Sequence, residues 1–552
     1  MVESTNFIKN IILNDKKSNT NLIIQTRFPP EPNGHLHFGH AKSIFLNFGL
    51  AELFKGNCNL RFDDTNPTTE NITYVNSIID SLSWLGFKAK PLYASDYFDL
   101  LYEYALIFIK NNLAYVDSNP YEKIKELRGT LTEVGIKSQY RERTIEENLK
   151  LFDEMKNGVH KEGAHVLRLK IDMSSPNINM RDPVIYRIKK TKHHRTKDNW
   201  KIFPMYDYTH CISDAIENIN YSLCTLEFED HRPLYDWILE KLKLFKIFKT
   251  LPRQIEFSRL NLTHVLLSKR KLLHLVESKK VNGWDDPRMP TLIGAKRRGY
   301  PPESFKLFMD RIGISKSDSW IDFSTFEDCV REILDSTAHR RFVIFDPVEV
   351  IIENFSDDQE ELCHAKNHPK TEDFGKREMI LTKRIYIDKQ DFMINPPKNF
   401  FRLKPGGRVR LRNGFTIECT SFELNDSREV KTIKCKYFAD SKSGTEGFSK
   451  YKVKGNIHWV SKKYNEKIVV NMYDRLFISE QPGTTDKNFV EELNPNSLKQ
   501  ITCFAEKNIY DNTISTYQFE RHGFFHIDDD SSEENLIFNR TVTLKDSWNK
   551  GI

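Results

Sequence analysis

Hydrophobic and polar residues follow one pattern near the N-terminus of the chain and another in its C-terminal part. Residues 21–28 form an apolar, β-branched run that ends in two prolines, and residues 57–67 contain a second such run, so both predict strands. Apolar residues at helical spacing predict helices over 39–54 and 70–87. A strand–helix–strand–helix order is typical of a parallel sheet, so this part predicts an α/β domain.

The pattern changes three times along the rest of the chain. Residues 101–204 mix helical stretches with basic, strand-like ones and indicate an inserted domain, after which strand and helix patterns resume over 205–258. Residues 259–339 are mainly helical in pattern. From 340 to 552, short alternating strands are separated by Gly, Asn and Asp turns, which predicts β-barrels or sandwiches.

Length and composition indicate a globular protein of several domains. The chain has 552 residues, 39% hydrophobic and 29% charged, and at about 100–200 residues per domain it is too long for one core. No apolar run reaches the roughly 18 residues of a membrane helix, and no secretory signal pattern is present. None of the eight cysteines forms a C-x-x-C pair, so we expect reduced thiols and a cytoplasmic location. Cys363, His364 and His368 lack a second ligand pair, so no protein metal site is predicted.

The net charge of +6 is small for this length, but its distribution is uneven. Residues 187–201 hold seven Lys or Arg side chains, and further basic runs occupy 268–271 and 296–298. Each run alone is typical of a solvated surface. Several in one chain, with aromatic residues between them, favour a phosphate-rich partner.

Residues 28–43, FPPEPNGHLHFGHAKS, carry the clearest chemical signal. A stiff Pro-rich turn follows the predicted strand, and His37, Gly39 and His40 begin the predicted helix. A helix N-terminus at a strand end is a ready anion site, and a glycine there lets a phosphate or base approach the backbone. The two histidines could donate hydrogen bonds to charge that grows on a phosphate. Taken alone, the same residues also fit a helical turn with two surface histidines, or a metal bound by His-x-x-His.

A second signal lies far downstream, at residues 259–272. Ser268 and Lys269 stand in a basic loop, where Lys269 could meet a β- or γ-phosphate and steady departing pyrophosphate. Alone this is an ordinary basic patch. Together with the His-x-Gly-His turn at the front of a split α/β domain, it favours nucleotide chemistry, with both segments acting on one triphosphate.

These two motifs resemble those of the class I aminoacyl-tRNA synthetases. Residues 31–40 resemble the HIGH motif, with Phe38 at the Ile position, and residues 266–270 resemble the KMSKS loop, with Leu267 in place of Met. The runs TRFPPEPNG, NLRFDDTNP, MYDYTHCISDA, SLCTLEFED and GWDDPRMPT are similar to the glutaminyl-tRNA synthetase family, and the similarity extends over essentially the whole chain.

The resemblance implies a fold of several parts. We expect an α/β Rossmann-like catalytic domain with an inserted α+β acceptor-stem domain, a helical linker domain and two C-terminal β-barrels. The expected boundaries are 1–100 and 205–258 for the two halves of the catalytic domain, 101–204 for the acceptor-stem-binding insertion, 259–339 for the helical domain with the KMSKS-like loop, and 340–552 for two anticodon-binding barrels.

The resemblance also implies the reaction. Glutamine's carboxylate attacks the α-phosphate of ATP, which enters with Mg²⁺, and a terminal 2′-hydroxyl of glutamine tRNA then takes up the activated amino acid. The implied partners are L-glutamine and the acceptor stem and anticodon of that tRNA, and the implied state is a monomer with no membrane contact. Three alternatives stay open: a glutamyl enzyme of the same subclass, a tRNA-binding paralogue without catalysis, and a much shorter kind of protein, a small-molecule adenylyl- or cytidylyltransferase.

By motif match, His37, His40 and Lys269 are the expected catalytic residues. Leu260 would lie beside adenine, with plain packing as its alternative reading. The expected ATP contacts are Glu31, Pro32, Asn33, His37, Gly39, His40, Ala41, Lys42, Ser43, Thr225, Arg259, Leu260, Leu267, Ser268 and Lys269.

The resemblance places four residues around glutamine. Asp63 would hold its α-ammonium ion, Tyr206 would present a hydroxyl to its side-chain amide, and Arg27 would help to set the pocket. Cys224 lies where the glutamate-specific relatives tend to carry a positive residue, so a neutral thiol there favours glutamine.

Most of the expected tRNA contacts fall in the inserted and C-terminal parts, whereas Asp230 and Lys316 lie outside both. Leu131 would be an apolar wedge at the first base pair, or else a core residue of a hairpin, and Asp230 would read a base edge. Phe401 stands where the family has a lysine, so either stacking replaces an ionic contact or the contact is absent. The full set is Leu131, Asp230, Lys316, Arg340, Arg402, Arg410, Arg412, Gln518 and Arg521.

Overall fold

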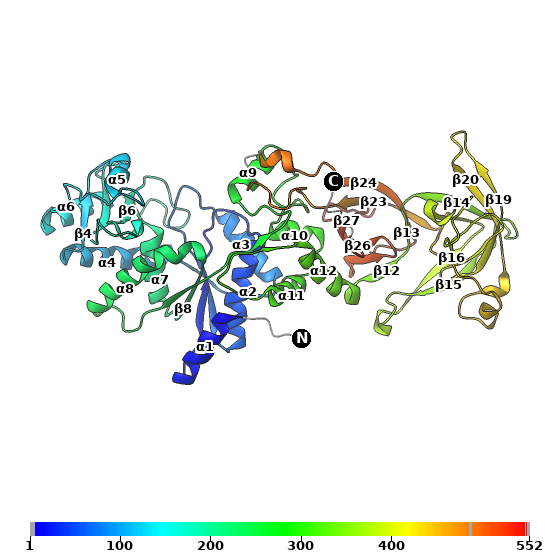
Figure 1. The fold of residues 1–552 in the computed structure, drawn as a ribbon, viewed down its shortest axis with the longest axis horizontal. Helices are drawn as coiled ribbons and strands as arrows, with labels where there is room; N and C mark the ends of the chain where they lie inside the picture. The colour runs from blue at the N-terminus through cyan, green and yellow to red at the C-terminus, as the bar shows by residue number, and fades with distance from the viewer. Residues whose placement is uncertain (1–5, 485–487, 547, 549–552) are drawn as a thin grey trace. The chain divides into compact units, whose positions relative to one another are not determined.

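The computed structural model describes residues 6–484, 488–546 and 548. The chain divides into two compact units. The first comprises Met1–Asn261 and Lys306–Ile321, and the second comprises Leu262–Phe305 and Asp322–Ile552. Figure 1 labels the elements of both units.

A parallel sheet forms the centre of the first unit. It contains β1 (Gln25–Phe28), β2 (Asn57–Phe62) and β3 (Pro91–Tyr93) in chain order, with the crossover helices α2 (Phe38–Leu53) and α3 (Ile72–Trp84). The predicted strand–helix–strand–helix order is therefore confirmed. A second parallel pair consists of β8 (Tyr221–Thr225) and β9 (Arg253–Phe257). The N–H of Asn220 donates to the carbonyl of Gln25, so β8 starts beside β1, and the carboxyl ends of both sets of strands meet at one edge. Ligands of open α/β sheets bind at that edge.

Both of the first two strands are shorter than the sequence predicts. A turn closed by the side chain of Asn19 precedes the ladder of β1, which begins at Gln25. Strand β2 ends at Phe62 because the next N–H, that of Asp63, donates to the carbonyl of Pro30 in the loop after β1. This hydrogen bond brings the Pro-rich turn and the end of β2 together.

Helix α1 (Phe7–Ser18) packs on this sheet through a narrow apolar stripe. Ile8 and Ile12 are one helical turn apart, and both are fully buried. They share a core with Ile24, Leu46, Leu50, Tyr221, Leu223, Ile255, Phe257 and Ile314.

An antiparallel sheet stands between β3 and β8 in the chain. Its four strands follow chain order: β4 (Ala114–Asp117), β5 (Val166–Leu169), β6 (Val184–Ile188) and β7 (Ile202–Pro204). The helices of this part are α4 (Phe98–Lys110), α5 (Tyr121–Arg128), α6 (Ile145–Lys156), α7 (Tyr206–Ile216) and α8 (Arg232–Leu244). Aromatic side chains from several of these elements share one core, in which the rings of Tyr102 and Phe152 stack 4.9 Å apart.

The second unit begins with helices, as the pattern of residues 259–339 predicts. They are α9 (Lys269–Glu277), α10 (Leu292–Arg298) and α12 (Phe323–Thr337), while α11 (Pro302–Ile312) crosses from this unit to the first. Residues 259–339 also contain two short strands, β10 (Asn261–Leu262), which spans the boundary of the units in the chain, and β11 (Trp320–Ile321), which belongs to the first unit.

Two seven-stranded, barrel-like sheets form the rest of the second unit, and their strands alternate as the sequence predicts. In β14, for example, Val348, Val350 and Ile352 are buried and the residues between them are not. The first sheet has the order β12 (His339–Arg341), β25 (Thr516–Phe519), β26 (Gly523–Ile527), β27 (Ile537–Val542), β23 (Asn465–Tyr473), β24 (Leu498–Glu506), β13 (Val343–Ile344). The second has the order β21 (Asn456–Ile457), β18 (Arg408–Leu411), β19 (Thr416–Leu424), β20 (Val430–Tyr437), β14 (Pro347–Ile352), β17 (Arg384–Asp388), β22 (Val460–Ser461). A separate hairpin pairs β15 (Glu361–Lys366) with β16 (Lys376–Leu381).

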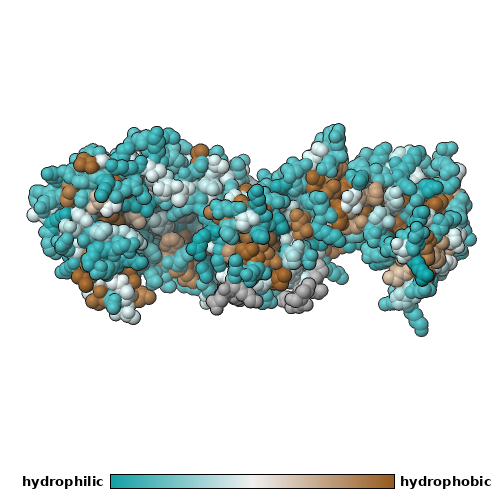
Figure 2. All heavy atoms as spheres, turned by 90° about the horizontal axis from the view of Figure 1, so that it is seen from above, coloured by the Kyte–Doolittle hydropathy of each residue, from teal (hydrophilic) through white to brown (hydrophobic). Residues whose placement is uncertain are grey.

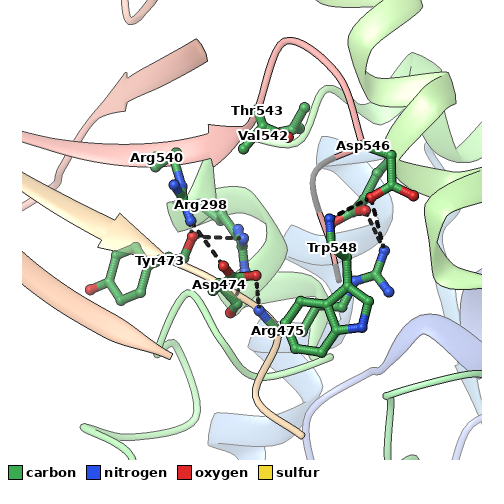
Figure 3. Close-up of a pocket in the computed structure, with 10 residues that line it drawn as sticks. Arg298, Tyr473, Asp474, Arg475, Arg540, Val542, Thr543, Asp546 and Trp548 are labelled. Atoms are coloured by element: carbon green, nitrogen blue, oxygen red, sulfur yellow. Dashed lines mark hydrogen bonds and ion pairs between the residues drawn. The ribbon is translucent and has the colours of Figure 1, made fainter. Parts of the chain in front are cut away.

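Charged side chains join the helices of the second unit to its first sheet (Figure 3). Arg475 donates to Glu327 of α12 at 2.8 Å, and Arg298 of α10 donates from Nε to the carbonyl of Thr541 at 3.2 Å. Arg540 pairs with Asp474 at 3.2 Å. The cavity between them measures about 20 Å³, room for about one water molecule, so this is a filled junction rather than a ligand pocket.

The face of the molecule in Figure 2 is mostly hydrophilic, with apolar side chains gathered in small areas. Among the described residues, no helix combines the length and apolar character needed to cross a bilayer.

Candidate functional site

His37 and His40 cap the first turn of α2. The ring Nδ1 of His37 accepts the N–H of Gly39 at 3.1 Å, and Nδ1 of His40 accepts the N–H of His37 at 3.0 Å. The two rings lie 3.9 Å apart. Burial, and then the neighbouring His40, hold the pKa of His37 well below its usual value. His37 is therefore neutral at physiological pH and carries its proton on Nε2.

This geometry favours phosphate chemistry over the metal alternative. With Nδ1 of each ring engaged by a backbone N–H, a neutral ring keeps its proton on Nε2 and offers no lone pair there to a metal ion. It can instead donate a hydrogen bond from Nε2, beside the N–H groups of the first turn of α2. The turn fits an anion that approaches the end of β1.

The other ATP residues predicted in the first unit occupy three places. Glu31, Pro32 and Asn33 form a tight turn, in which the side chain of Asn33 donates to that of Glu31 at 2.5 Å. Ala41 is buried and Ser43 half-buried within α2. The residues at the ends of β8 and β9 are Thr225, Arg259 and Leu260, of which Leu260 is buried and Arg259 exposed.

The residues of the KMSKS-like segment belong to the second unit. Helix α9 begins at Lys269, with Ser268 in an extended conformation as its N-cap residue, so Lys269 stands in the first turn of a helix. Leu267 directly precedes them and is half-buried. The meeting of this segment with the His37–His40 turn around one triphosphate stays a prediction.

Asp63 lies one residue beyond β2 with a side chain only 1% exposed. Its Oδ1 accepts from Arg61 at 2.7 Å, whereas Oδ2 has no hydrogen-bond donor among the described residues. Burial raises the pKa of Asp63 to about 6, although Arg61 opposes the shift. A buried carboxylate oxygen that lacks a donor is suited to receive one from a ligand, and an ammonium ion also supplies the opposite charge.

Asp214 of α7 balances the positive charges of two buried arginines near Asp63. Its carboxylate accepts from Arg27 at 3.1 Å and from Arg61 at 2.8 Å, and all three side chains are fully buried. Ser222 and Tyr235 donate to the other oxygen. Burial alone would raise the pKa of Asp214, but Arg27, His210 and Arg61 together keep it below the usual range. The guanidinium charges are thus balanced inside the protein.

Arg27, His210 and Tyr206 form a chain of contacts that starts beside Asp214. Nη2 of Arg27 lies 3.2 Å from Nε2 of His210, and Nδ1 of His210 lies 3.4 Å from the hydroxyl of Tyr206. Burial lowers the pKa of His210 to about 3, so the ring is neutral. Because Arg27 can only donate, the ring proton stays on Nδ1 and faces the Tyr206 oxygen.

Cys224 places a neutral thiol beside Arg27. Its Sγ lies 3.3 Å from Nη2 of Arg27, and burial raises the pKa of the thiol. The four predicted glutamine residues, Arg27, Asp63, Tyr206 and Cys224, are therefore brought together in the first unit.

Sequence reasoning missed Arg61, His210, Asp214 and Ser222, although two signals were present. Tyr206, His210 and Asp214 are spaced i, i+4, i+8 and so lie on one face of α7. Arg61 stands two residues from Asp63 across the end of β2. Ser222 carries no such signal.

A second polar cluster adjoins Asp63. The carboxylate of Asp64 accepts from the side chain of Ser95 at 2.7 Å and from Nε2 of His194 at 3.0 Å. His193 approaches the carbonyl of Asp64 through Nε2 at 3.0 Å, while its Nδ1 accepts two backbone N–H groups. His193 therefore donates from Nε2, so these residues form a hydrogen-bonded junction rather than a set of metal ligands.

The tRNA residues predicted in the first unit lie at the surface. Leu131 is 82% exposed in the loop after α5, so the alternative of a hairpin-core leucine is wrong. Asp230 is exposed, and its carbonyl accepts from Asn177 at 2.7 Å. Lys316 is exposed, with its ammonium group 5.9 Å from the ring of Phe7.

The tRNA residues predicted in the second unit fall into an accessible group and a buried group. Arg402, Arg412 and Arg521 are partly accessible and pair with carboxylates, two of them with the same Asp391. Arg340 and Arg410 are each only 5% exposed and donate to backbone carbonyls. Gln518 of β25 pairs in register with Arg340 of β12, and Phe401 is 52% exposed.

Comparison with known proteins gives consistent matches. The catalytic-domain model of "tRNA synthetases class I (E and Q)" matches residues 23–336, and two models of the anti-codon binding domain match 338–438 and 456–528. Glutamine–tRNA ligase of Nitrosomonas europaea is 55% identical and covers 99% of this chain and 98% of that protein. The protein of the same name from Cupriavidus metallidurans is 52% identical and covers 97% and 94%. A solved glutamate-tRNA synthetase from Elizabethkingia anophelis covers 57% of this chain and 72% of that chain, with 17% identity and a TM-score of 0.42, which is too low to support an argument.

Proposed function

The chain belongs to the class I tRNA synthetases of the E and Q type, and we propose on that basis that it attaches glutamine to its tRNA with ATP. The fold agrees with this family, since a catalytic domain precedes C-terminal anticodon-binding domains. The single observation that carries the function is the similarity, over nearly the full length, to proteins named glutamine–tRNA ligase.

In the proposed first step, this chain orients glutamine for attack on the α-phosphate of ATP. The donor-free Oδ2 of Asp63 binds the α-ammonium ion. His37 and His40 donate from Nε2 to the phosphate as its charge grows, together with the N-terminus of α2. Lys269 steadies the departing pyrophosphate. Mg²⁺ enters with ATP and neutralises phosphate charge, and no protein residue is assigned to hold it.

Selection of glutamine over glutamate follows from the charge balance of the pocket. Arg27 is balanced by Asp214, His210 is neutral, and the buried thiol of Cys224 is neutral. A second carboxylate would lose its hydration and find no unbalanced positive partner. The Tyr206 oxygen accepts a hydrogen bond from Nδ1–H of His210, so its own hydroxyl hydrogen is directed to the carbonyl of the substrate amide.

In the proposed second step, the 2′-hydroxyl of the terminal ribose attacks the glutaminyl-adenylate and releases AMP. Residues 101–204 grip the acceptor stem, with Leu131 as the wedge. Asp230, which lies outside this segment, reads a base edge of the stem. Residues 259–339 form the helical linker that carries Lys269, and 340–552 read the anticodon. The exposed candidates for that reading are Arg402, Arg412 and Arg521, with Arg340, Arg410 and Gln518 as further contacts. Lys316 is a proposed tRNA contact outside this part of the chain.

We further propose that the chain acts as a monomer in the cytoplasm. All eight cysteines are free thiols, as expected in a reducing compartment.

The test is charging of purified tRNA isoacceptors with labelled glutamine and labelled glutamate in parallel. Only glutamine, on glutamine isoacceptors, is expected to become tRNA-linked. Charging with glutamate instead would favour the glutamyl alternative, and tight tRNA binding without any charging would favour a non-catalytic paralogue.

A further inference from the structure

Lys42 stands on α2 one turn beyond Gly39, yet its ammonium group does not face the phosphate turn. The side chain is 4% exposed. Its Nζ donates to the carbonyl of Ser258 at 2.5 Å, to the hydroxyl of Ser258 at 3.2 Å and to the carbonyl of Arg259 at 3.5 Å. An ammonium ion has three donors, so these acceptors engage all of them.

The acceptors of Lys42 belong to the other end of the ATP site. Ser258 and Arg259 directly follow β9 and precede Leu260, in the segment proposed to surround adenosine. On its far side, the N–H of Ser258 donates to the carbonyl of Ser315 at 2.8 Å. The buried lysine therefore ties this segment to the helix whose first turn would bind the phosphates.

We propose that Lys42 is a positioning residue that holds the adenosine-binding end of β9 at a fixed place relative to the phosphate-binding turn of α2. The proposal rests on the proposed function, because it concerns the same ATP site. It replaces the prediction that Lys42 contacts ATP itself.

Lys42 also lines a cavity, and its three hydrogen bonds hold its ammonium group at Ser258 and Arg259. Lys42, Phe45, Gly49 and Met309 are among the residues that line a space of about 640 Å³. Without the ammonium group, two backbone carbonyls and the Ser258 hydroxyl would lose a hydrogen-bond donor, and the Ser258–Arg259 segment would shift.

The test uses Lys42→Met, which keeps most of the side-chain volume and removes the donors. Calorimetric titration of the purified full-length chain should give a Kd for ATP and a Kd for adenosine that both rise roughly 10- to 100-fold. Inorganic pyrophosphate, which lacks the adenosine group, should bind with unchanged affinity. The KM for glutamine should also stay unchanged.

Two further variants keep the result interpretable. Ser258→Ala leaves both carbonyl acceptors and should weaken adenosine binding by about three- to tenfold, and in the Lys42→Met background it should add little. Lys306→Met removes another lysine that lines the same cavity. This variant should bind adenosine and inorganic pyrophosphate as tightly as the native chain does. If Lys42→Met does not fold, Ser258→Ala alone decides, since native adenosine affinity in that variant would refute the proposal.

The pH profile adds an independent readout. Burial lowers the pKa of Lys42 to about 8, with Asp318 opposing the shift. Glu52, Lys306, Asp310 and Lys9 face the same cavity. As pH rises through about 8 the ammonium group loses a donor, so the native Kd for adenosine should rise, and this rise should be absent in Lys42→Met.

The possible outcomes distinguish a failure of the positioning role of Lys42 from a failure of the proposed charging function. Adenosine binding that is equal in Lys42→Met and the native chain, with weaker pyrophosphate binding, would show that Lys42 contacts phosphate and would overturn the proposal. If adenosine binding weakens as expected while the native chain charges no tRNA, the positioning role stands and the proposed function fails.

Discussion

At the scale of single residues, the ionisation of Asp63 should govern glutamine binding. Its pKa of about 6 means that the carboxylate is charged at neutral pH and gains a proton as pH falls through that value. A neutral acid pairs poorly with an ammonium ion. The KM for glutamine should therefore stay flat above about pH 7 and rise as pH drops below 6, approaching tenfold per unit. Charging kinetics between pH 5 and 8 measure this.

The control for that profile is Asp63→Asn. It should raise the KM for glutamine by roughly 10- to 100-fold and abolish its pH dependence, while the KM for ATP stays constant. Arg61 keeps Asp214 as its partner in this variant, so the protein should fold normally. An unaltered pH profile in Asp63→Asn would show that another group binds the ammonium ion.

Asp214 should matter for stability because it balances the charges of two buried arginines. Asp214→Asn removes the carboxylate shared by two fully buried guanidinium groups, those of Arg27 and Arg61. An uncompensated buried charge costs about 3–5 kcal/mol, so we expect a loss of that size in the free energy of unfolding. Since the pKa of Asp214 is depressed, this contribution is present at neutral pH and is lost only when pH falls below the usual range of an aspartate. Urea unfolding measures the loss.

The matched control for Asp214 is a surface aspartate with a similar partner. Asp96 pairs with Arg195 at 2.7 Å, with both side chains substantially exposed. Asp96→Asn should cost less than about 1 kcal/mol. Equal losses in the two variants would contradict the role given to the buried network.

At the scale of elements, the loop after α5 is predicted to affect tRNA charging but not stability. Leu131 is 82% exposed, so Leu131→Ala should leave the melting temperature unchanged. If the side chain replaces a stacked base at the end of the acceptor stem, kcat/KM for charging should fall about tenfold. Binding of ATP and glutamine should not change.

Val159 provides the control for Leu131. It is also a largely exposed apolar residue of the segment 101–204, at 67%, and lies outside the loop after α5. Val159→Ala should charge tRNA at the native rate. A native rate in Leu131→Ala as well would remove the wedge from the mechanism.

Local elements could be predicted from the sequence, whereas contacts between distant elements could not. The helix from Phe38 was predictable because its apolar spacing and the Gly39 turn are local features. The hydrogen-bond partner of Lys42 could not be predicted, because Ser258 lies 216 residues away and no local pattern links the two. The junction of Asp64 with His193 and His194 has the same origin, at sequence separations of 129 and 130 residues.

At the scale of the whole molecule, the motifs predicted the family and which residues are proposed to bind glutamine, whereas the energetics of that cluster needed coordinates. Asp63 and Tyr206 follow from short motifs, and their residues do lie in one unit. The burial that raises the pKa of Asp63 and neutralises His210 depends on packing from several elements. The alternating pattern after residue 340 predicted β structure, but strand order such as β12 beside β25 comes from distant pairing.

The central claim is that the His37–His40 turn and Lys269 activate glutamine on one ATP, and pyrophosphate exchange into ATP tests it most directly. In the presence of glutamine tRNA, the native chain should catalyse exchange with glutamine and not with glutamate. His40→Ala and Lys269→Ala should each reduce the rate roughly 100- to 1000-fold with tRNA affinity unchanged, whereas His364→Ala, at an exposed histidine, should have no effect. A native chain that binds tRNA but supports no glutamine-dependent exchange, or variants at both positions that exchange at the native rate, would contradict the account.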